Sequence, residues 1–207
     1  MDMKNIDDFN FRNRKALLRV DFNVPLNNEL IVTDETRIIA TIPTIKKIIN
    51  EGGSVILMSH LGRPKKGPED QYSLKHIIPN LQEKLGTEVK FASDCIGLSA
   101  LKLSQTLGTG EVMLLENVRF YPEEAKGDEN FASKLAKLGD IYVNDAFGTA
   151  HRAHASTTIV ARFFEDKCAG YIMGNELNNA KKVLEDPKRP FTAIMGGAKI
   201  SDKIMII

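Results

Sequence analysis

Apolar runs of strand length alternate with segments of helical periodicity along most of the chain. The runs that we predict as strands are Ala16–Val20, Ser54–Ser59, Glu88–Ala92, Glu111–Val118 and Ile141–Phe147. Several of them are apolar almost without interruption, which is typical of parallel strands whose two faces are both covered. The pattern therefore predicts an α/β fold: a doubly wound, mainly parallel sheet with helices on both faces, in a Rossmann-like three-layer arrangement.

Helices are predicted where apolar side chains recur at spacings of three and four residues. The first such stripe consists of Ile38, Ile39, Ile42, Ile45, Ile48 and Ile49. Gly52–Gly53 end this helix, because glycine adopts the left-handed cap conformation at little cost. A second helix has Ser73 as its N-cap and Gly86 as its end, and Pro79 inside it leaves a kink or a later start open. Two further helices are predicted over 98–107 and 129–138.

A domain boundary is predicted where a helical pattern runs into the breaker-rich stretch EDPKRP. We assign 1–174 to a substrate-binding domain, 175–190 to an interdomain helix and hinge, and 191–207 to the first strand and helix start of a second domain. The stretch FTAIMGGAKISDK fits that start, because a buried strand is followed by a glycine turn and a lysine-bearing helix. We expect this second domain to be incomplete, since the chain ends as it opens.

Charge and composition exclude several classes of protein. The 28 Lys and Arg nearly balance the 27 Asp and Glu, so no global field recruits nucleic acid or anionic lipid. No run reaches the ~18 apolar residues of a membrane span, and the N-terminal segment lacks a signal-peptide core. We therefore expect a cytoplasmic protein without nucleic-acid or membrane partners. Cys95 and Cys168 are interpreted as free buried thiols, with a disulfide as the weaker alternative.

Polar and cationic residues follow the predicted strands where each strand ends. In open parallel sheets, ligands bind outside the carboxyl ends of the strands, so these side chains are expected at one edge. The candidate cations are Arg37, His60, Arg63, Arg119 and Arg152. Arginine pairs bidentately with carboxylate and phosphate oxygens, which points to a small ligand that carries both groups. Asp21 and Asn23 can accept hydrogen bonds from a hydroxyl between the charged ends of that ligand.

Each of these motifs also has a plain structural interpretation. A single arginine after a strand is more often a solvated or ion-paired surface group, and only the coincidence of several favours a site. The histidines of HRAH invite a metal interpretation, but no carboxylate or cysteine near them in sequence completes a ligand set, so we assign no metal site. GGAKISDK resembles a phosphate-binding loop without matching its full pattern, and Gly-Gly after a strand is often only a tight turn.

Taken together, the motifs resemble those of phosphoglycerate kinases. They are LLRVDFNVPL, TRIIATIPTI, SHLGRPKKG, LLENVRFYPEE, VNDAFGTAHRAHAST and GGAKISDKI, in this order over nearly the whole chain. The resemblance is to the N-terminal half of that family, whose members are two-lobed monomers of about twice this length. It implies a glycolytic phosphotransferase that moves a phosphoryl group between 1,3-bisphosphoglycerate and ADP, with Mg-ADP or Mg-ATP held mostly by the second lobe.

The same resemblance implies roles for individual residues. Those implied to bind 3-phosphoglycerate or 1,3-bisphosphoglycerate are Asp21, Asn23, Arg37, His60, Arg63, Arg119 and Arg152. Arg37 and Lys199 would act at the transferred phosphoryl group, and Lys203 would bind the nucleotide phosphates. The isolated chain is then expected to bind triose substrate but to be essentially inactive.

Two alternatives to this interpretation stay open. The chain could be a non-catalytic folding fragment or interaction module that uses residues 169–207 to pair with a partner or to self-associate. An unrelated sugar-phosphate isomerase or dehydrogenase domain is the weaker alternative, because RVDFNVP has no G-x-G-x-x-G after the first strand.

Overall fold

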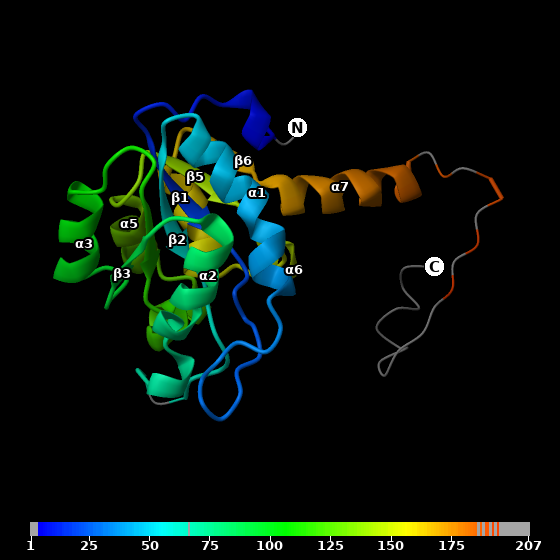
Figure 1. Cartoon of the computed structure of the whole chain (residues 1–207). Helices are drawn as coiled ribbons and strands as arrows, with labels where there is room; N and C mark the ends of the chain where they lie inside the picture. Colours follow the sequence, from blue (N-terminus) through cyan, green and yellow to red (C-terminus); the bar gives the residue numbers. More distant parts are fainter. Residues whose placement is uncertain are drawn as a thin grey trace. The chain divides into compact units, whose positions relative to one another are not determined.

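A six-stranded parallel sheet is the main feature of the computed structural model, which describes residues 4–65, 67–185, 187, 189–190, 192 and 194. The strands are β1 (Lys15–Arg19), β2 (Ser54–Met58), β3 (Val89–Ala92), β4 (Val112–Leu115), β5 (Ile141–Asn144) and β6 (Lys167–Ala169). Their order is β3-β4-β2-β1-β5-β6, and every neighbouring pair is parallel (Figure 1). β1 lies inside the sheet, with β2, β4 and β3 on one side of it and β5 and β6 on the other, which confirms the predicted doubly wound sheet.

Helices connect the strands. The α-helices of the described residues are α1 (Thr36–Asn50), α2 (Ile78–Leu85), α3 (Leu98–Gln105), α4 (Pro122–Lys126), α5 (Glu129–Ala136), α6 (Phe147–Ala150) and α7 (Tyr171–Leu184). Shorter turns of 3₁₀ or π type are η1 (Ile6–Asp8), η2 (Asp70–Tyr72), η3 (Leu74–Ile77), η4 (Val118–Phe120), η5 (Ala155–Ile159) and η6 (Val160–Phe163).

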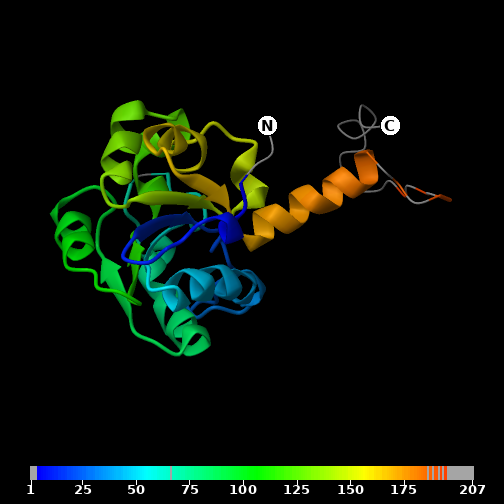
Figure 2. The same ribbon diagram turned by 90° about the horizontal axis from the view of Figure 1, so that it is seen from above.

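Alternate strand residues enter two apolar clusters, one on each face of the sheet. Leu18 belongs to the cluster that contains Ile45 of α1 and Leu81 of α2. Leu17, on the opposite face, belongs to the cluster that contains Phe131 of α5 and residues of α3. The period of two along the strands therefore separates the two helical layers, which Figure 2 shows on either side of the sheet.

The first predicted helix is present, but its isoleucines do not all face the sheet. Ile38, Ile45 and Ile48 of α1 are fully buried, whereas the side chain of Ile39 is 51% exposed. The side chains of successive helical residues point about 100° apart around the helix axis. Where two adjacent residues are both isoleucine, one of them therefore lies at or beyond the edge of the buried face.

The second predicted helix starts late, as Pro79 allowed. Ser73 caps the short turn η3, where its hydroxyl accepts a hydrogen bond from the backbone N–H two residues on. Only then does α2 begin, with Pro79 in its first turn, where the missing N–H would have no helical partner. Gly86 ends the helix with a φ of 73°, as its sequence position predicted.

Two predicted strands end early, and one strand was not predicted. β5 ends at Asn144, before its predicted end at Phe147. β4 ends at Leu115 because the next side chain, that of Glu116, accepts hydrogen bonds from the Ser73 hydroxyl (2.7 Å) and the Leu74 N–H (2.9 Å). This bonding draws the chain out of the ladder before the predicted end at Val118. β6 was not predicted, since three residues that begin with an exposed lysine give no apolar run.

The chain divides into two compact units, Met1–Glu176 and Leu177–Ile207. The helix that we predicted within 175–190 begins earlier, at Tyr171. The assignment of 1–174, 175–190 and 191–207 to separate functions stays a prediction. The strand and helix expected in 191–207, with Lys199 and Lys203, lie outside the described residues apart from 192 and 194.

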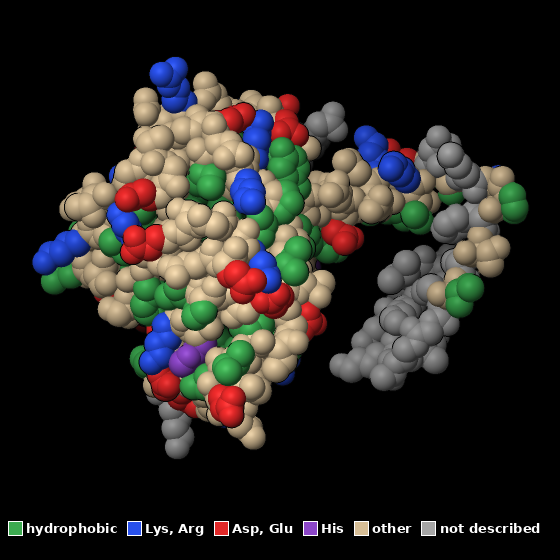
Figure 3. Space-filling view, in the orientation of Figure 1, with side chains coloured by type: hydrophobic (Ala, Val, Ile, Leu, Met, Phe, Trp, Pro, Cys, Tyr) green, Lys and Arg blue, Asp and Glu red, His purple; other side chains and the backbone are tan. Residues whose placement is uncertain are grey.

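Lys, Arg, Asp and Glu side chains are interspersed over the face shown in Figure 3, in keeping with the net charge of +1. Among the described residues, no helix combines the length and the apolar character that crossing a bilayer requires.

Candidate functional site

All seven side chains predicted to bind substrate line a single cavity of about 310 Å³. Its lining residues are Asp21, Asn23, Arg37, His60, Gly62, Arg63, Arg119, Gly148, Thr149 and Arg152. The structure thus brings together every candidate that lies in its described part. Their individual roles in binding remain predictions.

The cavity lies at the carboxyl ends of four neighbouring strands. Asp21 and Asn23 follow β1, His60 and Arg63 follow β2, Arg119 follows β4, and Arg152 follows β5. These strands are adjacent in the order β4-β2-β1-β5, so parallel pairing brings residues that are distant in the sequence to one edge. Arg37 joins them from the first turn of α1.

One of the four cavity arginines has a carboxylate partner. Arg37 donates a hydrogen bond to Asp21 in an ion pair at the cavity rim, where the Arg37 side chain is 51% exposed. Exposed pairs of this kind contribute at most about 1 kcal/mol, so an anionic ligand can compete for Arg37. Among the described residues, Arg63, Arg119 and Arg152 form no ion pair with a carboxylate. The cavity therefore retains positive charge for an anion.

Gly62 connects the loops that carry the cavity side chains. Its N–H donates to the Asn23 side-chain oxygen (2.8 Å), and its carbonyl accepts from Arg119 Nη1 (2.8 Å). Its φ is +61°, and a Cβ added there would lie 2.4 Å from ring atoms of Tyr72. Both the backbone conformation and the space therefore require glycine.

Replacing Gly62 with alanine is expected to destabilise the chain by about 1–3 kcal/mol and to weaken anion binding, because the loop must move away from Tyr72. Urea unfolding and a phosphate-ligand titration measure the two effects. Gly86→Ala is the matched control, since Gly86 has a similar φ of +73° with nothing within 4 Å of the added Cβ. If Gly62→Ala and Gly86→Ala had equal effects on both measurements, Gly62 would not have the proposed role of connecting the loops of the cavity.

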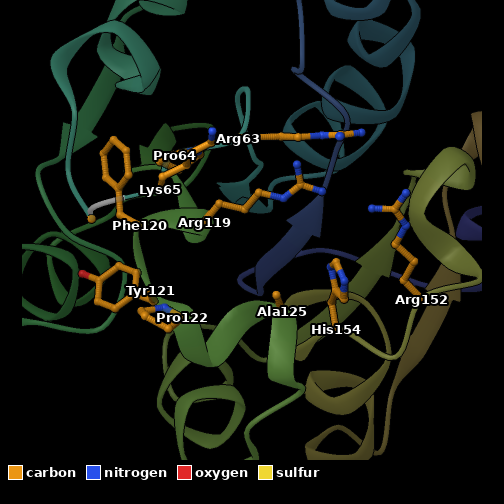
Figure 4. Close-up of a pocket in the computed structure, with 11 residues that line it drawn as sticks. Arg63, Pro64, Lys65, Arg119, Phe120, Tyr121, Pro122, Ala125, Arg152 and His154 are labelled. Carbon is orange, nitrogen blue, oxygen red and sulfur yellow. The ribbon is translucent and has the colours of Figure 1, made fainter.

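A second cavity, of about 410 Å³, is lined by three of the same arginines. Figure 4 shows the guanidinium groups of Arg63, Arg119 and Arg152 directed toward one another, with His154 close to them. Lys65 also lines this second cavity. The three arginines thus face two adjoining spaces, and both spaces are cationic.

His60 is a neutral side chain in this cationic environment. It is 4% exposed, and burial, followed by the charges of Arg19, Arg119, Arg37 and Arg152, lowers its pKa from 6.5 to about 2. His60 therefore adds no charge to the cavity at neutral pH. Its remaining capacity is to donate or accept a hydrogen bond.

The free energy of unfolding is expected to fall as the pH drops below 6.5, because the unfolded chain then protonates His60 while the folded chain does not. This one group contributes a slope of at most about 1.4 kcal/mol per pH unit. Urea unfolding of the chain and of His60→Gln over the acid range measures the contribution. The stability advantage of the unsubstituted chain should shrink as pH falls; an advantage independent of pH would argue against a depressed His60 pKa.

A buried polar network behind His60 was missed from the sequence. Arg19 is 1% exposed, and its Nη2 lies 3.2 Å from His60 Nδ1. Arg19 Nε donates to the Ser156 hydroxyl (2.9 Å), which donates to the buried carboxylate of Glu124 (2.6 Å). The burial of Arg19 could have been recognised because it is a charged residue inside an otherwise apolar strand. Nothing in the sequence distinguished the buried Glu124 from the exposed Glu123.

The described residues contain no group of three or more His, Cys, Asp and Glu side chains that could hold a metal ion. Lys199 and Lys203, the residues predicted to act on the phosphoryl group and the nucleotide, are not among the described residues.

Comparison with known proteins identifies relatives over the whole chain. The family model for phosphoglycerate kinase matches residues 6–207. Curated phosphoglycerate kinases of Porphyromonas gingivalis and Chlorobium limicola are each 50% identical, over 98% and 100% of this chain. The chain covers 54% and 52% of those two proteins, so it spans about half the length of the curated relatives it matches.

Solved structures give the same result. The phosphoglycerate kinase from Coxiella burnetii matches with a TM-score of 0.88 and 36% identity, over 98% of this chain and 50% of that one. The enzyme from Pyrococcus horikoshii also has a TM-score of 0.88, with 33% identity over 99% of this chain and 51% of that one. With the family match over nearly its full length, the chain belongs to the phosphoglycerate kinase family.

Proposed function

We propose that this chain is the triose-binding half of a phosphoglycerate kinase, the enzyme that moves a phosphoryl group between 1,3-bisphosphoglycerate and ADP. The observation that carries the proposal is the convergence of four arginines, His60, Asp21 and Asn23 on one cavity of about 310 Å³. The ligand proposed for this cavity is 3-phosphoglycerate or its acyl phosphate. On its own, the chain is proposed to bind this ligand with essentially no turnover.

The charges of the cavity suit a ligand with two anionic ends. Arg63, Arg119 and Arg152 supply guanidinium groups without carboxylate partners in the described part of the chain, which favours a phosphate group. Arg37 and Asp21 form a weak pair at the rim that a ligand carboxylate and hydroxyl could share between them. A three-carbon acid phosphate carries all three groups.

Phosphoryl transfer asks for placement and positive charge more than for covalent chemistry by the protein. Arg37 is the cavity arginine that we assign to the transferring group, because it pairs with Asp21 where we place the ligand carboxylate, the group that carries the acyl phosphate. Lys199 and the nucleotide-binding Lys203 are assigned to the opposite side of the reaction from sequence resemblance alone. When bound, a magnesium ion would neutralise nucleotide phosphate charge, and none of the described residues is assigned to hold it.

Titration of 3-phosphoglycerate into the chain, followed by backbone amide chemical shifts, tests the proposal. Shifts are expected to concentrate at His60, Arg63, Arg119 and Arg152, with saturation at a single stoichiometric site. Glycerol added under the same conditions is the neutral control and should leave these amides unchanged. The absence of any shift at these residues at millimolar ligand would overturn the proposal.

A further inference from the structure

Arg19 is held in one orientation by contacts on every side of its guanidinium group. Nε donates to the Ser156 hydroxyl, Nη1 donates to the Val20 carbonyl, and Nη2 lies 3.2 Å from His60 Nδ1. The side chain is 1% exposed and does not line the substrate cavity. Among the described residues, the cavity side chain that lies within hydrogen-bond distance of Arg19 is His60.

The charge of Arg19 is balanced from the other side by Glu124. Ser156 uses its hydroxyl twice: it accepts from Arg19 Nε and donates to Glu124 Oε1 (2.6 Å). The Ser156 N–H also donates to Glu124 Oε2 (2.8 Å), and the Glu124 side chain is 1% exposed. The three side chains form a continuous buried chain of hydrogen bonds that ends at the imidazole of His60.

This contact determines which nitrogen of His60 carries the proton. A guanidinium group has five N–H donors and no acceptor, so the ring nitrogen next to Arg19 Nη2 must accept. The proton of the neutral imidazole is then on Nε2. Nε2 has no hydrogen-bond partner among the described residues. It is also absent from the set of fully buried polar atoms that lack a partner, so it is accessible from the cavity. Its N–H is available to a ligand in the cavity.

We propose that Arg19 is a positioning residue that fixes His60 as the neutral Nε2–H tautomer and so makes it a hydrogen-bond donor to the oxygen atoms of the substrate. The inference rests on the proposed function for the identity of the ligand, but the state of the imidazole is a property of the free chain. The other tautomer would present a lone pair to a ligand whose own atoms are acceptors. With Arg19 in place, His60 presents an N–H to the ligand oxygens instead of a ring-nitrogen lone pair that would repel them.

The tautomer can be read directly from long-range proton–nitrogen correlation spectra of the chain labelled with ¹⁵N in its histidines. The chain has four histidines, so the His60 pattern is assigned from its loss in His60→Gln. We expect a protonated, pyrrole-type Nε2 and an unprotonated, pyridine-type Nδ1, unchanged on acidification to the limit of the folded state. A His60 that carries its proton on Nδ1, or that is charged at neutral pH, would overturn the proposal.

The role of Arg19 is tested with Arg19→Met combined with Glu124→Gln, which removes both buried charges together and protects the fold. In this variant His60 is expected to populate both tautomers, and affinity for 3-phosphoglycerate is expected to fall about ten-fold through loss of one oriented donor. Arg19→Lys, which keeps a charged donor, should restore part of the Nε2–H population. Arg14→Met is the control, because Arg14 precedes the same strand but pairs with Asp166 (2.8 Å).

The two readouts separate the inference from the proposed function. A folded double variant that keeps the original tautomer would show that Arg19 does not set it, and one that loses the tautomer but keeps full affinity would show that the tautomer does not serve binding. If the unsubstituted chain binds no 3-phosphoglycerate, the proposed function fails, while the tautomer spectra still decide whether Arg19 orients His60.

Discussion

Replacing Arg119 with alanine is expected to weaken binding of 3-phosphoglycerate by about ten- to one-hundred-fold, the usual effect of removing a charged hydrogen-bond partner. Arg119 is half buried, and its Nη1 is fixed on the Gly62 carbonyl, so little entropy is lost when its other donors meet a ligand. No carboxylate of the described residues forms an ion pair with it. Isothermal titration calorimetry of the chain with 3-phosphoglycerate measures the effect.

Arg162→Ala is the matched control for this substitution. Arg162 is an exposed arginine that pairs with Glu129 (3.2 Å) and lines neither the substrate cavity nor the adjoining cavity of about 410 Å³. Its removal changes the net charge by the same amount and should leave affinity within about two-fold. An equal loss in both variants would mean that binding responds to total charge rather than to the cavity, and the assignment of Arg119 would be wrong.

Replacing Glu124 with leucine is expected to destabilise the chain by about 3–5 kcal/mol, because the buried charge of Arg19 loses its counterion. The loss also leaves the N–H and the hydroxyl of Ser156 without their acceptor. The midpoint and slope of urea unfolding give the change in the free energy of unfolding.

The neighbouring residue supplies the control. Glu123 carries the same charge on the same short helix but is exposed, so Glu123→Ala should change stability by less than about 0.5 kcal/mol. Combining Glu124→Leu with Arg19→Met should cost less than the sum of the two single changes, since the double variant leaves no unbalanced buried charge. Additive effects would show that the two groups do not interact.

The sequence allowed prediction of most of the fold because strand and helix periods differ clearly. Buried runs such as 54–59 could be placed within a residue or two, and parallel pairing then brought Asp21, His60 and Arg152 to one edge. The cavity could be predicted because most of its residues lie in the segments that follow the strands, while Arg37 lies at the start of the first predicted helix. β6 could not, because its place in the sheet depends on pairing with β5 rather than on its own pattern.

The buried network of Arg19, Ser156 and Glu124 behind the cavity could not be predicted from the sequence, for a different reason. Glu124 and Ser156 are 32 residues apart in the sequence, and Ser156 is 137 residues from Arg19, so their contact depends on the tertiary fold. Their residue types are common in surface turns, so local patterns favour solvent exposure. The pairing of Arg37 with Asp21 was also not predicted, since both were assigned to the ligand and their mutual contact depends on how α1 meets the end of β1.

The chain of hydrogen bonds from Glu124 to His60 also specifies how β1 is aligned with its neighbours. Leu17 and Arg19 face the same side of the sheet, toward α5, whereas Leu18 faces α1. A slip of β1 by one residue would turn Arg19 into the apolar layer beneath α1 and leave Glu124 opposite a leucine or a valine. Misaligned states of the strand would therefore carry two unmatched charges, which raises their energy far above that of the native pairing.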